Sequence, residues 1–163
     1  MPLVVATLQA ELIGIYEKGP TGNPSPQLVG LDTAKAYMNF CSTGMNAGAG
    51  SFTAMPGASA LGQELGDIYS STSPAGALTG QKMAKAFNNC LGTFISVHQT
   101  TIVTAAGLGG LIAGLIDIFS SPNPSATIFA NKLAKELNTF TLSAQVIGVI
   151  PGTPPVPFTG PIS

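Results

Sequence analysis

The sequence predicts a mostly α-helical protein with short strands, built of three tandem helix-loop-helix-strand repeats that share one core. Two recurring phrases carry this prediction. The first is LQAELIGIY at Leu8–Tyr16, which returns as LGQELGDIY at Leu61–Tyr69 and as LIAGLIDIF at Leu111–Phe119. The second is AKAYMNF at Ala34–Phe40, which returns as AKAFNNC at Ala84–Cys90 and as AKELNTF at Ala134–Phe140. Because both phrases keep their order and a spacing of 50 to 53 residues, we expect a repeat architecture.

The repeat divides the 163 residues into three units and a tail. The predicted boundaries are 7–59 for unit one, 60–110 for unit two, 111–152 for unit three and 153–163 for a Pro-rich extended arm. A chain of this length is long enough to bury one sizeable core, whereas a unit of about 50 residues would be marginal alone. We therefore expect a single domain in which the three units share their core.

The first phrase of each unit predicts an amphipathic helix. Its apolar residues fall at positions i, i+4, i+7 and i+8, as in Leu8, Leu12, Ile15 and Tyr16, which form one stripe of a 3.6-residue period. A glycine enters each of these helices and costs about 1 kcal/mol relative to alanine. We expect these glycines to mark close contacts with a neighbouring helix, and they are Gly14, Gly66 and Gly114.

A Pro-containing loop follows each first helix, and a second helix follows each loop, at about 33–43, 80–94 and 126–142. The recurring lysines of these helices are read as a solvated face rather than as catalytic groups. They are Lys35, Lys85 and Lys135. Short β-prone segments close the units at 51–55, 100–104 and 145–150.

The tail PGTPPVPFTGPIS contains five prolines, which exclude a helix and a central strand. It is predicted to be either an extended arm lying on another molecule or a disordered end. The apolar residues Phe158 and Ile162 favour the arm.

Charged residues are scarce: they make up 8% of the chain, against about 25% in an average soluble protein, and the net charge is −1. All six basic residues are lysines, so the arginine-based recognition of phosphates and guanine is missing, and no nucleic-acid partner is expected. A near-neutral surface rich in small residues favours association, which predicts a homo-oligomer or ring; a monomer rich in small residues is the alternative. The side chains assigned to structure and assembly are Leu12, Tyr16, Leu65, Tyr69, Leu115, Phe119, Phe87, Phe140 and Phe158.

No catalytic, cofactor-binding or metal-binding motif is found in the sequence, so we expect a protein that is not an enzyme and needs no cofactor. Cys41 and Cys90 are predicted to be buried free thiols, because both lie on the apolar side of helices. His98 is the sole histidine, and a hydrolase of unknown type would have to use it. That hydrolase is kept as the second alternative function.

Residues 99–116 carry no charge and include glycines at GxxxG spacing, Gly110 and Gly114. A membrane span is nevertheless not expected, because the stretch straddles a repeat boundary: a strand ends at Thr104 and a helix phrase opens at Leu111. A membrane-active amphipathic protein that uses 99–116 is the first alternative function.

The segment SAQVIGVIPGTPPVPFTGPIS follows a helix rich in Ala, Lys and Asn. This ending resembles the C-terminal part of small structural proteins of tailed bacteriophages, in which Ala-rich helix pairs precede such a segment. The resemblance covers about forty residues well and the earlier units only as diverged copies. It implies a non-enzymatic virion component, made in the host cytoplasm, that binds itself and other virion proteins in a neck, tail, baseplate or capsid. It carries over no functional residues.

Overall fold

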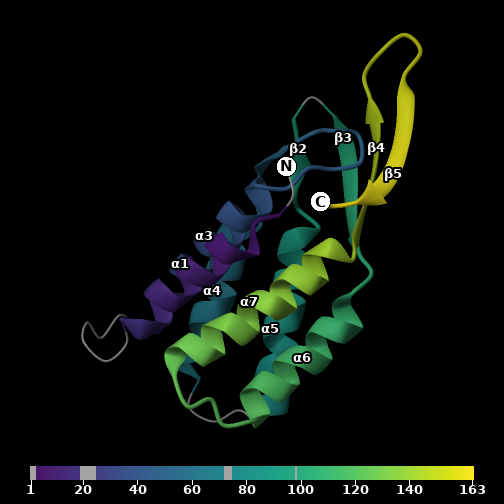
Figure 1. The fold of residues 1–163 in the computed structure, drawn as a ribbon. Helices are drawn as coiled ribbons and strands as arrows, with labels where there is room; N and C mark the ends of the chain where they lie inside the picture. Colours follow the sequence, from purple (N-terminus) through teal and green to yellow (C-terminus); the bar gives the residue numbers. More distant parts are fainter. Residues whose placement is uncertain (1–2, 19–24, 72–74, 98) are drawn as a thin grey trace.

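The structure is a computed structural model that describes residues 3–18, 25–71, 75–97 and 99–163 (Figure 1). Within these residues the chain is mostly helical with short antiparallel strands, as the sequence predicts. The elements in order are α1 (Val5–Glu17), α3 (Pro26–Ser42), β1 (Phe52–Ala54), α4 (Ala58–Ser70), α5 (Gly76–Leu91), β2 (Ile95–Ser96), β3 (Thr100–Ala105), α6 (Leu108–Ser120), α7 (Ala126–Leu142), β4 (Ala144–Ile150) and β5 (Val156–Pro161).

Two of the three second helices begin earlier than predicted. Helix α3 begins at Pro26 because the Ser25 hydroxyl accepts a hydrogen bond from the Leu28 N–H at 3.2 Å and proline suits the first helical position. Ser25 and Pro26 therefore start the helix, although they were assigned to the loop. Helix α5 begins at Gly76 rather than Gly80 and ends at Leu91 rather than Phe94.

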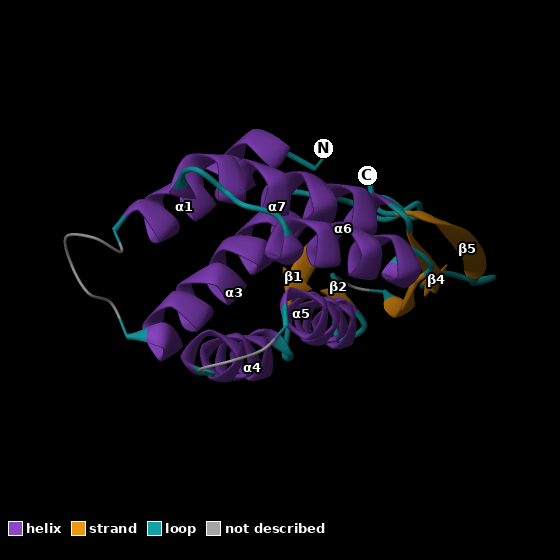
Figure 2. Cartoon of the chain, turned by 90° about the horizontal axis from the view of Figure 1, so that it is seen from below, coloured by secondary structure: helices purple, strands orange, loops and turns teal. Residues whose placement is uncertain are grey.

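The helices pack in a closed order. Helix α3 lies along α4, α5 along α6, and α7 along α1, while the two helices joined by each loop touch less extensively. Figure 2 looks nearly along α4 and α5 and shows α3 between α1 and α4. Each second helix thus packs mainly on the first helix of the next predicted unit, and α7 closes the ring on α1.

Glycines permit the closest of these contacts. A Cβ added at Gly30 would lie 2.5 Å from the Gly66 backbone nitrogen on α4, and one added at Gly80 would lie 2.6 Å from the Ile116 nitrogen on α6. The equivalent residue of α7 is Ala130, which is fully buried. The backbones of α3 and α4, and of α5 and α6, therefore approach closely enough to exclude a methyl group.

The three glycines chosen from the sequence have different surroundings. A Cβ at Gly66 would lie 2.9 Å from the Gln27 Cα, which agrees with a close helix contact. The prediction is wrong for Gly14, which has nothing within 4 Å, because it lies on the exposed side of α1. A Cβ at Gly114 would meet the Glu136 side chain rather than a backbone.

One core joins all three predicted units. The ring centroids of Tyr37 on α3 and Phe87 on α5 lie 5.0 Å apart, and the Tyr37 hydroxyl lies 2.8 Å from the Thr141 hydroxyl on α7. Fully or almost fully buried side chains recur at 50-residue intervals, as the repeat hypothesis predicts; that the units are copies of one another stays a prediction. Three such sets are Ala34, Ala84 and Ala134; Tyr37, Phe87 and Leu137; and Phe40, Cys90 and Phe140.

The strands lie at one end of the helices, together with both chain ends (Figure 1). Strands β1 and β2 form a two-stranded sheet, and β3, β4 and β5 form an antiparallel sheet in that order. In the larger sheet Ile102 pairs with Ile147, and Ile147 pairs with Thr159.

The Pro-rich tail is extended and not disordered, because it folds back as β5 onto β4 of its own chain; that it also lies on another molecule stays a prediction. The two expected anchors explain this. The Phe158 ring packs on Gly48 and Gly148, whose lack of side chains leaves room for it. Ile162 is 1% exposed and lies beside Gly44. Ser163 then exchanges backbone hydrogen bonds of 2.7 and 2.9 Å with Met45.

Residues 99–116 do not form one helix. They are divided among β3, a turn and the first half of α6, which begins at Leu108. Among the described residues no helix is long and apolar enough to cross a membrane.

Candidate assembly surface

The side chains predicted to serve structure and assembly make contacts within the chain. Five of them are almost fully buried: Leu12, Leu65, Leu115, Phe87 and Phe140. The half-buried members are Tyr16, Tyr69, Phe119 and Phe158. Tyr16 and Tyr69 join their hydroxyls at 2.7 Å, and Phe129 packs against both Tyr16 and Phe119. The five buried side chains are closed to a partner of the folded chain, while the half-buried ones keep part of their surface exposed, so that any role of these four in assembly stays a prediction.

Charged side chains are confined to part of the molecule. They are Glu11, Glu17, Lys18, Asp32, Lys35, Glu64, Asp67, Lys82, Lys85, Asp117, Lys132, Lys135 and Glu136. No Lys, Arg, Asp or Glu occurs in 36–63, 86–116 or 137–163. Because these three stretches contain all the described strands, the strands carry no Lys, Arg, Asp or Glu.

The three-stranded sheet has one buried and one exposed face. Alternation along β4 turns Ala144 and Val146 inward, where both are fully buried, and turns Ile147 and Val149 outward. On the neighbouring strand Val103 is 6% exposed and Ile102 is 66% exposed. The outward positions are Thr104, Ile102 and Thr100 on β3, Gln145, Ile147 and Val149 on β4, and Pro161, Thr159 and Pro157 on β5.

This outward face combines exposed aliphatic side chains with hydroxyls and prolines. Ile147 is 49% and Val149 is 40% exposed, and Ile147 lies directly across from Ile102, so the aliphatic side chains are neighbours. The β4–β5 hairpin extends past the helices (Figure 1), and Val156 near its tip is 54% exposed. An apolar cluster of this kind on a folded surface is typical of an interaction site.

The edge of the sheet at β5 is poorly suited to pairing with another strand. Of the alternate β5 positions 157, 159 and 161, two are prolines. Only Thr159 among these three therefore has an N–H group. Prolines on an edge strand block the addition of a further strand. The outward face therefore offers a partner a better surface than this edge does.

The opposite end of the molecule is different in character. Leu28, Leu78 and Ile128 occupy equivalent positions in the first turns of α3, α5 and α7 and are 48%, 45% and 40% exposed. Charged residues such as Asp32 and Lys82 lie one turn further along the same helices. At this end the exposed aliphatic side chains stand singly among charged residues. On the sheet they lie next to one another, and the strands carry no charged residues.

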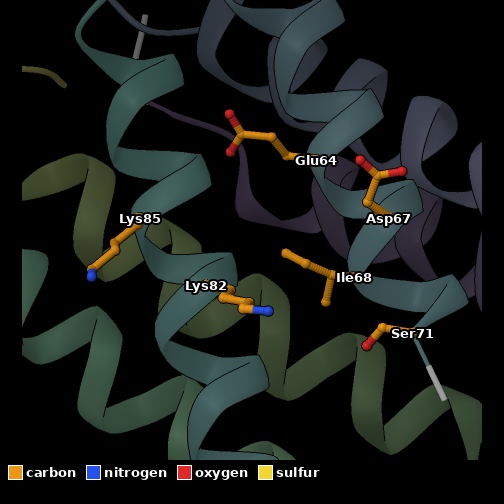
Figure 3. A pocket seen from close by; sticks show the side chains of 6 residues that line it. All are labelled: Glu64, Asp67, Ile68, Ser71, Lys82 and Lys85. Carbon is orange, nitrogen blue, oxygen red and sulfur yellow. The ribbon is translucent and has the colours of Figure 1, made fainter. Parts of the chain in front are cut away.

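A groove of ≈ 340 Å³ lies between α4 and α5 and is lined by carboxylates and lysines. Figure 3 shows Glu64 and Asp67 on the α4 side and Lys82 and Lys85 on the α5 side, with Ile68 between them. A second groove, between α1 and α3, is lined by the equivalent residues Glu11, Ile15 and Lys35 among others. Because the groove recurs at equivalent positions between the two helices of units one and two, it follows from the packing of these helices.

The remaining reactive groups of the described residues are enclosed. Cys41 and Cys90 are buried and free, as predicted. Burial raises the pKa of the Cys90 thiol to about 12 and raises the pKa of Cys41 further, so both thiols stay protonated and poorly nucleophilic. No group of three or more His, Cys, Asp or Glu in the described part of the chain could hold a metal ion. His98, on which a hydrolase would depend, lies outside the described residues.

Comparison with known proteins adds no relative. No protein-family model matches the chain, and neither a curated protein nor a solved structure was found to match it.

The outward sheet face is not among the predicted assembly residues, although two signals of it are present in the sequence. TTIVTA and AQVIGVI are rich in β-branched residues, which favour strands, and each lies in a long stretch without Lys, Arg, Asp or Glu. These stretches were interpreted only as a global shortage of charge, not as a shortage confined to one end.

Proposed function

We propose that this protein is a non-enzymatic structural subunit of a tailed-phage virion, located in the neck, tail, baseplate or capsid periphery. In this proposal it joins other virion proteins through its uncharged sheet end. The observation that carries the proposal is that every Lys, Asp and Glu lies in a helix or, for Lys18, directly after α1, while Ile102, Ile147 and Val149 are exposed on a sheet without charged residues.

The physical basis is the cost of removing water. Burying a charged group in an interface is costly unless the partner supplies an opposite charge, whereas burying uncharged aliphatic surface is favourable. A soluble protein with so little charge at one end has weak protection against association there. A permanent subunit loses nothing by this arrangement, because its partners cover the surface.

The resemblance of the C-terminal segment to small phage structural proteins supplies the class of particle. The resembling stretch of about forty residues includes β4, the Pro-rich turn and β5. These elements carry most of the outward face, so the resembling segment and the candidate assembly surface coincide. The expected location is the virion, after assembly in the host cytoplasm.

The proposal is tested in phage particles. Virions purified from an infected culture are digested, and peptides of this chain are quantified by mass spectrometry against the major capsid protein. We expect the chain in a fixed ratio to that protein. Its absence from purified particles overturns the proposal.

A complementation experiment tests the surface. The chain is supplied as Ile102→Lys or as Leu78→Lys, which places the same charge at the other end of the molecule. We expect Ile102→Lys to be lost from particles and Leu78→Lys to be retained. Equal incorporation of both variants would show that the sheet end is not the assembly surface.

A further inference from the structure

We infer that the outward face of β3, β4 and β5 binds the same face of a second copy of this chain, forming a twofold dimer. The inference deepens the proposed function and rests on it, because it names the first partner of the sheet end.

The absence of charge favours a second copy as the occupant. The same patch on two copies can approach face to face, because it carries no like charges to repel one another. A partner with charged side chains at the contact would leave them desolvated, since this face has no counter-charge to offer. The hydroxyls of Thr100, Thr104 and Thr159 supply neutral donors and acceptors around the aliphatic centre.

The size of the face fits a modest dimer. Three outward positions on each of three strands, with strands ~4.8 Å apart and alternate residues ~6.7 Å apart, cover about 300 Å² in the plane of the sheet. Side-chain relief roughly doubles this to ~600 Å² of accessible surface per copy, or ~1,200 Å² in all, the lower limit for specific interfaces. We therefore expect a dimer that dissociates on dilution.

The symmetry identifies the central contact. Ile147 is the middle position of the middle strand, flanked by Ile102 on β3 and Thr159 on β5. A twofold axis through the centre of such a face brings Ile147 of each copy opposite its equivalent. In face-to-face packing the two sheets lie ~10 Å apart. A cysteine at position 147 would then lie within reach of its copy through a short bismaleimide.

The experiment compares Ile147→Cys with Leu78→Cys as the matched control at the far end. Both variants are treated with a bismaleimide of ~8 Å reach, chosen for the ~10 Å spacing of packed sheets. The native thiols are buried and should not react. We expect a covalent dimer from Ile147→Cys and a monomer from Leu78→Cys. Equal yields from the two variants overturn the inference.

Sedimentation velocity over a hundredfold range of concentration gives an independent readout. We expect the wild type and Leu78→Lys to pass from monomer to dimer as concentration rises and Ile147→Lys to stay monomeric while folded by circular dichroism. A wild type that is monomeric throughout overturns the dimer.

The failure of this inference can be separated from the failure of the proposed function. If the wild type is monomeric but Ile102→Lys is still lost from particles, the dimer is refuted and the virion role stands, with another protein as the occupant. If the wild type floats with phosphatidylcholine vesicles and Ile147→Lys does not, the face binds lipid and both proposals fall.

Discussion

Replacing Gly30 by alanine is expected to destabilise the protein, although alanine is the better helix former. A Cβ at this position would lie 2.5 Å from the Gly66 nitrogen, whereas ordinary contact begins at 3.4 Å. Helices α3 and α4 must therefore separate by about 0.9 Å at this point, the difference between the two distances. Neither wall of the contact is a flexible side chain, so the strain cannot be relieved by a rotamer change.

The magnitude follows from two opposing terms. Overpacking of this kind costs about 3 kcal/mol when backbones must move, and the helix propensity of alanine returns about 1 kcal/mol. We expect a net loss of about 2 kcal/mol, or a melting temperature lower by about 4–8 °C in a domain of this size. Gly14→Ala is the matched control, because Gly14 has nothing within 4 Å. It should gain up to about 1 kcal/mol.

Urea denaturation followed by far-UV circular dichroism measures both variants. The midpoint should fall for Gly30→Ala and rise for Gly14→Ala, with the slope unchanged, since the surface exposed on unfolding is the same. A Gly30→Ala protein as stable as the wild type would refute the close approach of α3 and α4.

Three further results are expected. Tyr37→Phe should lower the free energy of unfolding by about 1 kcal/mol. The Thr141 hydroxyl donates its hydrogen to a backbone carbonyl, so it accepts a hydrogen bond from the Tyr37 hydroxyl, which the variant lacks; a double-mutant cycle with Thr141→Val measures the pair. Burial raises the pKa of all three tyrosines and of Cys90 in the folded protein, so the unfolded chain loses these protons first as pH rises above 9 to 10. The urea midpoint should therefore keep its full value below that range and fall above it. A constant midpoint up to pH 11 would contradict this. Phe158→Ala should cost about 1–2 kcal/mol and speed amide exchange in β5, whereas exchange unchanged from the wild type would mean that the ring does not hold the tail.

The helices could be predicted because their signal is local. The spacing of Leu8 and Leu12, and of their equivalents, fixes one apolar stripe for each first helix, and these leucines are buried in the structure. The partner of each helix could not be predicted in this way. The close pairing of Gly30 with Gly66 depends on how far apart two backbones lie, which one sequence does not record. The same repeat wrongly predicts a close helix contact at Gly14, which has nothing within 4 Å.

The tail shows a different limit. Its prolines exclude a helix and a central strand, and β5 is an edge strand. Whether such a segment pairs with its own chain or with another molecule depends on long-range contacts, here Phe158 on Gly48 and Ile162 beside Gly44. The candidate site shared this limit: composition predicted an uncharged surface, but only the strand register places Ile102, Ile147 and Val149 side by side.

The most direct test of the account is the accessibility of the sheet face within the assembled particle. Ile102→Cys, at a position that is 66% exposed in the chain, is labelled with a maleimide in the purified protein, diluted until it is monomeric, and in virions, with Leu78→Cys as the control. The account predicts that both cysteines react in the free protein and that only Cys at position 102 becomes protected in the particle. Equal reaction at position 102 in the free and assembled forms would contradict it.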